Sequence, residues 1–276
     1  MKSIHFWTIV LLLTLSTSAC YEDVADCLDP DATNFNVRAD QACPDDCCEF
    51  PTLSLDITRV WGDTTLLSEL DTLVDRDGNE FTLTSFRFYF TDIELEAEGG
   101  LLPIPENFVE LDVLEGADTV LTEINANLIL VDNTAGTETV GRLRTGTEPL
   151  TQVQGRFGMS NGFPAVYPPS APSSSPLMTQ SGLLNFNDGQ GYLLASVEYL
   201  TFPDSTEVRV DIWGNVPMQL PFGTSVAPLR GTDLTVEIDA DFLALFNGID
   251  VTASETTVAV DLVSRLPFFL RATGVR

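Results

Sequence analysis

The fold is decided by FTLTSFRFYFTDIELEA, residues 81–97. Aromatic residues recur in it at a period of two, which places their side chains on one face of an extended strand. Two aliphatic residues then continue the pattern one residue out of step, so we predict a bulge near Thr91-Asp92. A strand with one apolar face needs a second layer to cover it, and we expect this aromatic run to be core and not a cofactor site. The predicted core residues are Phe86, Phe88, Phe90, Ile93 and Leu95.

Further strands are predicted on both sides of this stretch. Alternating apolar and polar residues mark them, most clearly at Leu53, Leu55 and Ile57, and each strand is expected to have one face in the core and one in water. Asp77-Gly78 supplies a turn before the aromatic strand. The expected strands include residues 52–60, 81–97, 208–213, 234–239 and 256–263.

Helical patterning is confined to residues 240–248, where Asn247-Gly248 would end a short helix. The stretch 163–182 is rich in Pro and Ser and is too long for a passive connection, so we expect it to contact a ligand or partner. The chain is therefore predicted to be all-β: an antiparallel β-sandwich with long loops, preceded by a small disulfide-stapled N-terminal segment.

Residues 1–19 read MKSIHFWTIVLLLTLSTSA and resemble a secretory signal peptide, because a single Lys precedes an apolar run too short to span a membrane. Cys20 follows Ser18-Ala19, the arrangement at which bacterial lipoproteins are cleaved and lipidated, although Thr17 stands where Leu is usual. We predict cleavage and a lipid on Cys20, which would place the protein in the cell envelope, at the outer membrane or the cell surface. An ordinary signal peptide with a coincidental Cys is the alternative.

Removal of that segment would leave a chain without His or Lys, because His5 and Lys2 are the sole residues of their kinds. The full chain carries 41 Asp and Glu against 13 Lys and Arg, a formal net charge of −28. Such a field repels nucleic acid and anionic membrane surfaces, so we expect neither as a partner. The charge suits cation binding, life in high salt, or a solvated acidic surface with no specific role.

Four further cysteines lie in an acidic segment, residues 20–50. In an exported protein, an even set of cysteines suggests disulfides, here two. Adjacent Cys47 and Cys48 are poorly placed to pair with each other, so each is expected to pair with Cys27 or Cys43. A zinc site is the alternative, but the spacing is poor and the compartment oxidising.

The same segment contains CLDPDATNFNVRADQAC, residues 27–43, which resembles a short Cys-bounded module of exported bacterial proteins. Its Asp and Asn side chains supply the hard oxygen ligands that calcium needs. The alternative is a disulfide-stapled spacer in which these side chains form turns. The residues that carry the resemblance are Asp29, Pro30, Ala32, Asn34, Phe35, Asn36 and Ala39.

Catalytic motifs are weak in this sequence. GMSNG, residues 158–162, matches the pattern around a hydrolase nucleophile, but without His or Lys after cleavage there is no base beside Ser160, and we interpret the motif as a turn. Neighbouring carboxylates such as Asp204 with Glu207 arise by chance among 41 acids, so none is singled out as a catalytic pair. We therefore expect no enzyme.

A series of short motifs runs through residues 52–265: a first strand, V-x-G, a Leu-rich strand, an aspartate turn, an aromatic strand and three later steps. They are Val60–Gly62, Leu66-Leu67, Asp75–Phe81, Phe88–Leu95, Phe108–Asp112, Gly155–Gly158 and Gly191-Tyr192. In order and spacing these motifs resemble the MbnP-like domain family, which is associated with methanobactin and copper in some bacteria. Residues 51–276 are therefore expected to form an MbnP-like β-sandwich domain.

The resemblance implies a secreted or lipid-anchored sandwich with copper binding, in which family members use His side chains and a modified Trp before the Gly-Tyr step. Here residues 182–187 contain no Trp, and residues 266–276 contain no His. The remaining soft ligands are Met159, Met178 and Met218, which are far apart in the sequence. Without imidazole the chain lacks the main ligands of a tight copper site. We therefore expect the fold of the family but make no prediction of its copper chemistry here, and the cofactor remains unassigned.

These observations predict a lipid-anchored binding protein of the cell envelope, with a metal-related ligand, another small ligand or an envelope protein as partner. The alternative is a structural or adhesive surface lipoprotein that binds calcium or nothing specific. An envelope hydrolase that uses two carboxylates is a third possibility.

Overall fold

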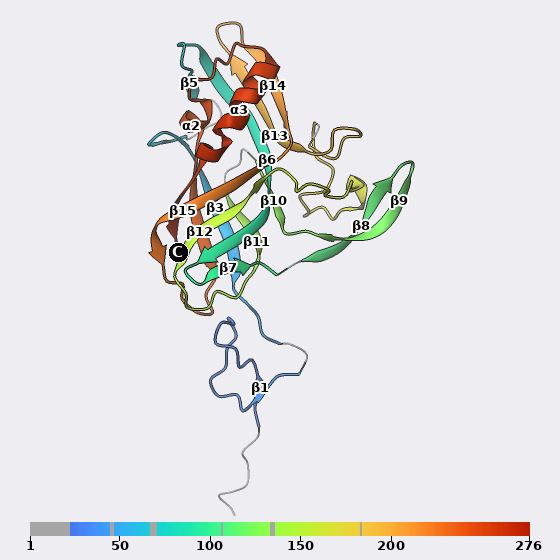
Figure 1. The fold of residues 1–276 in the computed structure, drawn as a ribbon, viewed down its shortest axis with the longest axis vertical. Helices are drawn as coiled ribbons and strands as arrows, with labels where there is room; N and C mark the ends of the chain where they lie inside the picture. The colour runs from blue at the N-terminus through green and yellow to red at the C-terminus, as the bar shows by residue number, and fades with distance from the viewer. Residues whose placement is uncertain (1–22, 45–46, 67–70, 106, 133–135, 183) are drawn as a thin grey trace, which may run out of the picture.

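Two β-sheets pack against each other in the computed structural model (Figure 1), which describes residues 23–44, 47–66, 71–105, 107–132, 136–182 and 184–276. The larger sheet is centred on the aromatic strand. Its path is β14 (Thr206–Trp213), β13 (Leu193–Thr201), β6 (Glu80–Ala97), β12 (Leu150–Phe157) and β15 (Val216–Val226). Three shorter strands also pair with β6: β5 (Thr72–Val74), β7 (Gly100–Pro103) and β10 (Leu128–Val131).

The smaller sheet faces the apolar side of β6. Its path is β11 (Thr137–Arg142), β3 (Thr52–Trp61), β16 (Leu234–Asp241) and β17 (Leu270–Val275), with β4 (Thr64–Thr65) paired to β3. The remaining elements are the hairpin of β8 (Phe108–Glu115) and β9 (Asp118–Asn125), the short strands β1 (Ala25–Asp26) and β2 (Gln41–Ala42), the 3₁₀ turn η1 (Pro168–Ser170), and the helices α2 (Phe242–Phe246) and α3 (Glu255–Phe269). The hairpin projects from the side of the sandwich (Figure 1).

The main core lies where the sequence pattern placed it. All five predicted residues of β6 are at most 4% exposed, as are the three predicted on β3. The Phe86 ring lies 5.5 Å from that of Phe88 and 5.0 Å from that of Phe269, so the aromatic strand packs against the end of α3. Because all of these residues belong to one buried cluster that both sheets and both helices supply, the prediction of a β-sandwich is confirmed.

The predicted bulge in β6 is also present. Between Gln154 and Arg156 the register of β12 advances two residues, while β6 advances three, from Glu94 to Thr91. Asp92 has a φ of +52°, in the left-handed region that Asp tolerates better than most residues. The bulge shifts the side-chain alternation by one, which is why Phe90 and Ile93 both face the core.

The sandwich is not wholly antiparallel, because β3 and β16 pair in parallel from Leu53↔Leu234 to Val60↔Asp241. Alternation along a single strand does not reveal the direction of its partner. The two strands are far apart in the sequence and lie in the middle of the smaller sheet, where a parallel pair covered by other elements is stable.

The prediction of a strand at residues 256–263 is wrong, since these residues lie in α3. Apolar residues at Val258 and Leu262 fit a helical spacing of four as well as a strand spacing of two. Val260, which the strand reading needs in the core, is 66% exposed. Ser254 caps the helix by accepting a hydrogen bond from the Thr257 N–H at 3.3 Å. The predicted short helix is confirmed as α2, with Asn247 at its C-terminal end.

Two disulfides staple the N-terminal segment, Cys27–Cys48 and Cys43–Cys47, so the adjacent cysteines pair outward as predicted. Its Asx side chains form local hydrogen bonds. Asn34 donates to the Cys47 carbonyl at 2.8 Å and accepts from the Glu49 N–H at 2.9 Å, while Asp29 accepts from the Asp31 N–H. These are the turn contacts of the spacer interpretation.

This segment also docks on the sandwich through ion pairs. The carboxylates of Asp29 and Asp31 both contact the Arg144 guanidinium, and Asp31 Oδ1 lies 2.9 Å from Arg230 Nε. Beside them, Gly231 sits so close to the segment that a Cβ atom would lie 2.7 Å from the Ala32 carbonyl oxygen. The arginines thus supply the positive charge next to two of the carboxylates that suggest a calcium site in the sequence.

Candidate functional site

A second, smaller core lies on the other side of β6. Its buried residues come from β6, the hairpin, β10, and the segment from 159 to 193. The rings of Phe163 and Phe186 lie 5.6 and 5.5 Å from that of Tyr192, and Tyr89 is wholly buried in the same cluster. The expectation that the aromatic strand has one face in water is therefore wrong around Tyr89, because the hairpin and the Pro/Ser-rich loop cover it.

The Pro/Ser-rich loop is fixed in place by Tyr192. The Tyr192 hydroxyl donates to the Pro164 carbonyl at 3.0 Å and accepts from the Val166 N–H at 3.0 Å. Burial raises the pKa of Tyr192 to about 12, so the hydroxyl keeps its proton at neutral pH. Val166 and Leu177 are buried as well, so the loop packs as a wall through a residue in each of its halves.

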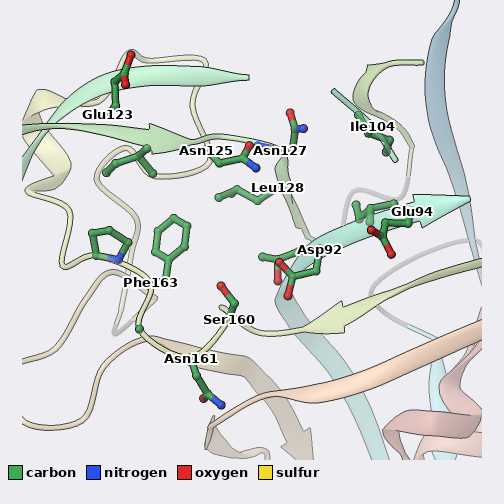
Figure 2. Close-up of a pocket in the computed structure, with 15 residues that line it drawn as sticks. Asp92, Glu94, Ile104, Glu123, Asn125, Asn127, Leu128, Ser160, Asn161 and Phe163 are labelled. Atoms are coloured by element: carbon green, nitrogen blue, oxygen red, sulfur yellow. Dashed lines mark hydrogen bonds between the residues drawn. The ribbon is translucent and has the colours of Figure 1, made fainter. Parts of the chain in front are cut away.

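A cavity of about 540 Å³ lies where this wall, the β6 bulge and the base of the hairpin meet (Figure 2). We call it the bulge cavity. In Figure 2, Asp92 and Ser160 point toward one another, and Phe163 and Leu128 lie across from them. The residues that line it are Thr91, Asp92, Ile93, Glu94, Ile104, Glu123, Ile124, Asn125, Asn127, Leu128, Ser160, Asn161, Gly162, Phe163 and Pro164.

A glycine allows the backbone segments at the floor of the cavity to approach each other closely. The Gly158 N–H donates to the Tyr89 carbonyl, and Gly158 has a φ of +80°. A Cβ atom there would lie 2.6 Å from the Gly214 carbonyl oxygen, so only glycine fits. Thr91 Oγ1 then donates to the Gly158 carbonyl at 2.8 Å. GMSNG forms a glycine-bounded turn, as predicted, but its Ser160 faces the cavity.

The carboxylates of the cavity are held by neighbours on β12. Arg156 Nε donates to Asp92 at 3.1 Å, and Gln154 donates to Glu94 at 2.7 Å. On the hairpin side, Glu123 lies directly opposite Glu110 in the β8–β9 register. The polar side of the cavity can therefore orient a ligand through carboxylate oxygens on β6 that β12 keeps in place, with Glu123 of β9 also in the lining.

Comparison with known proteins identifies the family of this chain. A family model described as MbnP matches residues 51–260. The chain belongs to the MbnP family. The structure also resembles MbnP from Methylosinus trichosporium, with 16% sequence identity, 73% of this chain and 79% of that chain covered, and a TM-score of 0.44. No curated protein matches the chain.

The sequence motifs that resemble the MbnP family come together in space. Phe88–Leu95 contains the β6 bulge, and Gly155–Gly158 forms the end of β12 beside it. Phe108–Asp112 forms the hairpin strand opposite Glu123 and Asn125. Of these segments, which are distant in the sequence, Phe88–Leu95 supplies four residues to the lining of the bulge cavity, and Tyr89 and Leu111 belong to the small core next to it.

The predicted metal ligands do not come together. Met159 is buried in the small core and Met218 in the main core, while Met178 is half-buried in the Pro/Ser-rich loop. Within the described residues, no group of three or more His, Cys, Asp or Glu side chains is placed to hold a metal ion. The predicted lipidation site, Cys20, lies outside the described residues, as does the signal peptide at 1–19.

The two tryptophans of the described residues, Trp61 and Trp213, lie beside aromatic or mixed surfaces. Trp61 contacts the Phe81 ring edge-on at 6.1 Å. Trp213 packs against the small core and lines a separate groove with Val260 of α3.

Sequence reasoning missed most of the cavity residues. Glu94 lies about 30 residues before Asn125 and Asn127, and only the topology brings it together with them. The usable signals were the predicted bulge at Thr91-Asp92 and the GMSNG turn, both of which border the cavity.

Proposed function

We propose that this chain is a lipid-anchored binding protein of the bacterial cell envelope, and that its MbnP domain holds a ligand in the bulge cavity without catalysing a reaction. One observation carries the proposal: the β6 bulge, the β9 side of the hairpin, the start of β10 and the GMSNG turn, which are distant in the sequence, line one shared pocket. Its volume of about 540 Å³ lies in the range of sites for small ligands.

The anchoring part of the proposal rests on the sequence of residues 1–20. Among the described residues, no helix has the length and apolar character needed to cross a membrane. A lipid on Cys20 would attach the chain just before the docked Cys-rich segment.

The residues at hand do not fit a copper centre. Copper sites are built from imidazole, thiolate or thioether ligands, whereas the bulge cavity presents carboxylate, amide and hydroxyl oxygens. The four cysteines of the N-terminal segment are in disulfides, and Met159 and Met218 belong to different cores. We therefore propose no role for copper in this chain. Because of the family association, copper is still measured in the metal analysis described below.

Anchoring is tested by fractionating bacterial cells that express the full chain, beside a Cys20→Ser variant. We expect the wild-type chain in the membrane fraction with the mass of a lipid added at Cys20, and the variant in a soluble fraction or uncleaved. A wild-type chain of the same mass as an ordinary secreted protein would contradict the anchor.

Binding is tested by ligand-observed NMR with a library of small fragments and the full chain. The Ser160→Trp variant fills the cavity, and Ser174→Trp adds the same ring to an exposed site in the Pro/Ser-rich loop. We expect binders whose signals are lost with Ser160→Trp and kept with Ser174→Trp. Fragments that bind both variants equally would show that the binding site lies outside the bulge cavity.

Metal analysis of the chain purified without chelator separates this proposal from its rivals. We expect no stoichiometric metal. Stoichiometric copper would support a copper role and refute the fit argument above, while stoichiometric calcium without cavity binding would favour the adhesive alternative.

A further inference from the structure

The ligand class of the bulge cavity follows from its lining. Three carboxylates contribute, those of Asp92, Glu94 and Glu123, and the described lining residues include no Lys, Arg or His. Arg156 lies beside the cavity, but it is paired with Asp92 and also donates to Asn215. An anionic ligand would therefore meet negative charge with no cation left to receive it.

Two of the side-chain donors of the lining are used within the protein. Asn127 Nδ2 donates to the Pro105 carbonyl at 2.7 Å, and Thr91 Oγ1 donates to the Gly158 carbonyl. Acceptors remain in excess, because Asp92 and Glu94 each have two carboxylate oxygens with several lone pairs, and Arg156 and Gln154 each donate to only one of those oxygens. A ligand that brings its own N–H donors completes such a site.

The opposite wall is apolar. Phe163 and Leu128 lie across the cavity from Asp92 (Figure 2), Ile104 closes one side, and Pro164 is also part of the lining. An aromatic face attracts a cation held above it, and an aliphatic wall favours a carbon skeleton. Carboxylates alone would not define a ligand, but a concave pocket of about 540 Å³, surplus acceptors and an apolar wall together select for one.

We propose that the bulge cavity binds an organic cation, a protonated amine or guanidine attached to an apolar group. This inference rests on the proposed function, since it names the ligand class of the same site. The cationic group lies against Asp92 and Glu94, and the apolar group lies against Phe163 and Leu128. The formal net charge of −28 raises the local concentration of such a ligand around the protein.

The test uses three probes of one shape, benzylamine, benzyl alcohol and benzoate, with N-acetylglucosamine as a neutral polar probe. Calorimetry with the full chain gives their dissociation constants at neutral pH. We expect benzylamine to bind at least about fivefold more tightly than benzyl alcohol, because each ion pair contributes up to about that factor. Benzoate is expected not to bind, and added salt should weaken benzylamine more than benzyl alcohol.

Matched variants test whether the carboxylates of the cavity cause the preference for benzylamine. The Glu94→Gln/Glu123→Gln pair removes two charges from the cavity, and Glu115→Gln/Glu207→Gln removes two from exposed positions on β8 and β14, outside the lining. We expect the first pair to weaken benzylamine about fivefold or more and to leave benzyl alcohol within about twofold. The second pair should leave both probes within about twofold, since it changes net charge equally without changing the cavity.

Equal weakening by both pairs would overturn the inference, because it would assign the effect to overall charge. Tighter binding of benzyl alcohol or N-acetylglucosamine than of benzylamine, lost in Ser160→Trp, would also overturn it while leaving the cavity as a binding site. If no probe and no library fragment depends on Ser160, both the ligand class and the proposed function fail.

Discussion

Replacement of Asp75 by Asn should destabilise the whole domain, because this carboxylate joins two loops. Asp75 is 8% exposed, and its Oδ1 accepts from the N–H groups of Asp77 and Asn79, each at 2.8 Å. Its Oδ2 accepts from Asn79 Nδ2 at 2.9 Å and from the Val251 N–H at 3.2 Å. The turn before β6 is thereby tied to the loop before α3.

In the Asp75→Asn variant one oxygen becomes an NH₂ group, which would face the donors of Asn79 and Val251. Hydrogen bonds to a charged group contribute about 1.5–3 kcal/mol each, and a buried donor left unpaired costs about 1–3 kcal/mol. We expect the free energy of unfolding to fall by about 3 kcal/mol in total. For a domain of this size that corresponds to a melting temperature lower by about 6–12 °C.

The stability difference between wild type and the Asp75→Asn variant should also depend on pH. Burial by itself would raise the pKa of Asp75, but the four hydrogen bonds outweigh it, and the net effect lowers the pKa below its usual value of 3.8. A carboxyl group with a lowered pKa stabilises the fold above its unfolded pKa and loses that contribution as the pH falls through the folded pKa. The difference between wild type and variant should stay constant from about pH 7 to 5 and shrink below about pH 4.

The assay is urea unfolding followed by circular dichroism, with Asp77→Asn as the matched control. Asp77 makes its side-chain contact with the neighbouring Arg76 on the surface, so this control should change stability by less than about 0.5 kcal/mol. If Asp75→Asn unfolds within about 0.5 kcal/mol of wild type, or equals its control, the loops are not joined as described.

Three further predictions concern the helix, the core and the docked segment. Leu262→Ala should lower the free energy of unfolding by about 2–5 kcal/mol, and the matched Val260→Ala by less than about 1 kcal/mol, because Leu262 is buried and Val260 is exposed. Equal losses would contradict the helical assignment of this segment. Tyr199→Phe should cost about 1 kcal/mol, because the buried hydroxyl donates to the Val251 carbonyl at 2.9 Å, and an unchanged urea midpoint would refute that bond. Arg230→Ala should speed proteolytic release of the Cys-rich segment at low salt, and an unchanged cleavage rate would show that the ion pairs do not hold it.

The sandwich could be predicted because period-two alternation is a local property. Leu53 and Phe88 each lie in a run whose neighbours alternate, and both are buried as expected. The stretch 256–263 shows the limit of this reasoning. Its apolar residues recur at spacings of both two and four residues, which fit a strand and a helix equally well, and only packing against the rest of the domain selects the helix. Ser254, three residues before Thr257, was a cap signal that favoured the helix.

The cavity could not be predicted, because its members share no local pattern. Glu94 and Glu123 meet around it only after the hairpin folds back on the bulge of β6. The docking of the N-terminal segment was missed for the same reason. Arg144 and Arg230 are isolated in the sequence, and nothing local indicates that both contact Asp31.

The position of β6 between two cores has a practical consequence. Phe88 faces the main core, Tyr89 the small core, and Asp92 the cavity, so occupancy of the cavity and unfolding of the domain are thermodynamically linked through one strand. Any compound that binds the folded cavity, at a concentration a hundred times its dissociation constant, would add about 2.7 kcal/mol to the stability of the domain. Thermal melting of the whole protein can therefore serve as a screen for its natural ligand, whatever the chemistry of that ligand.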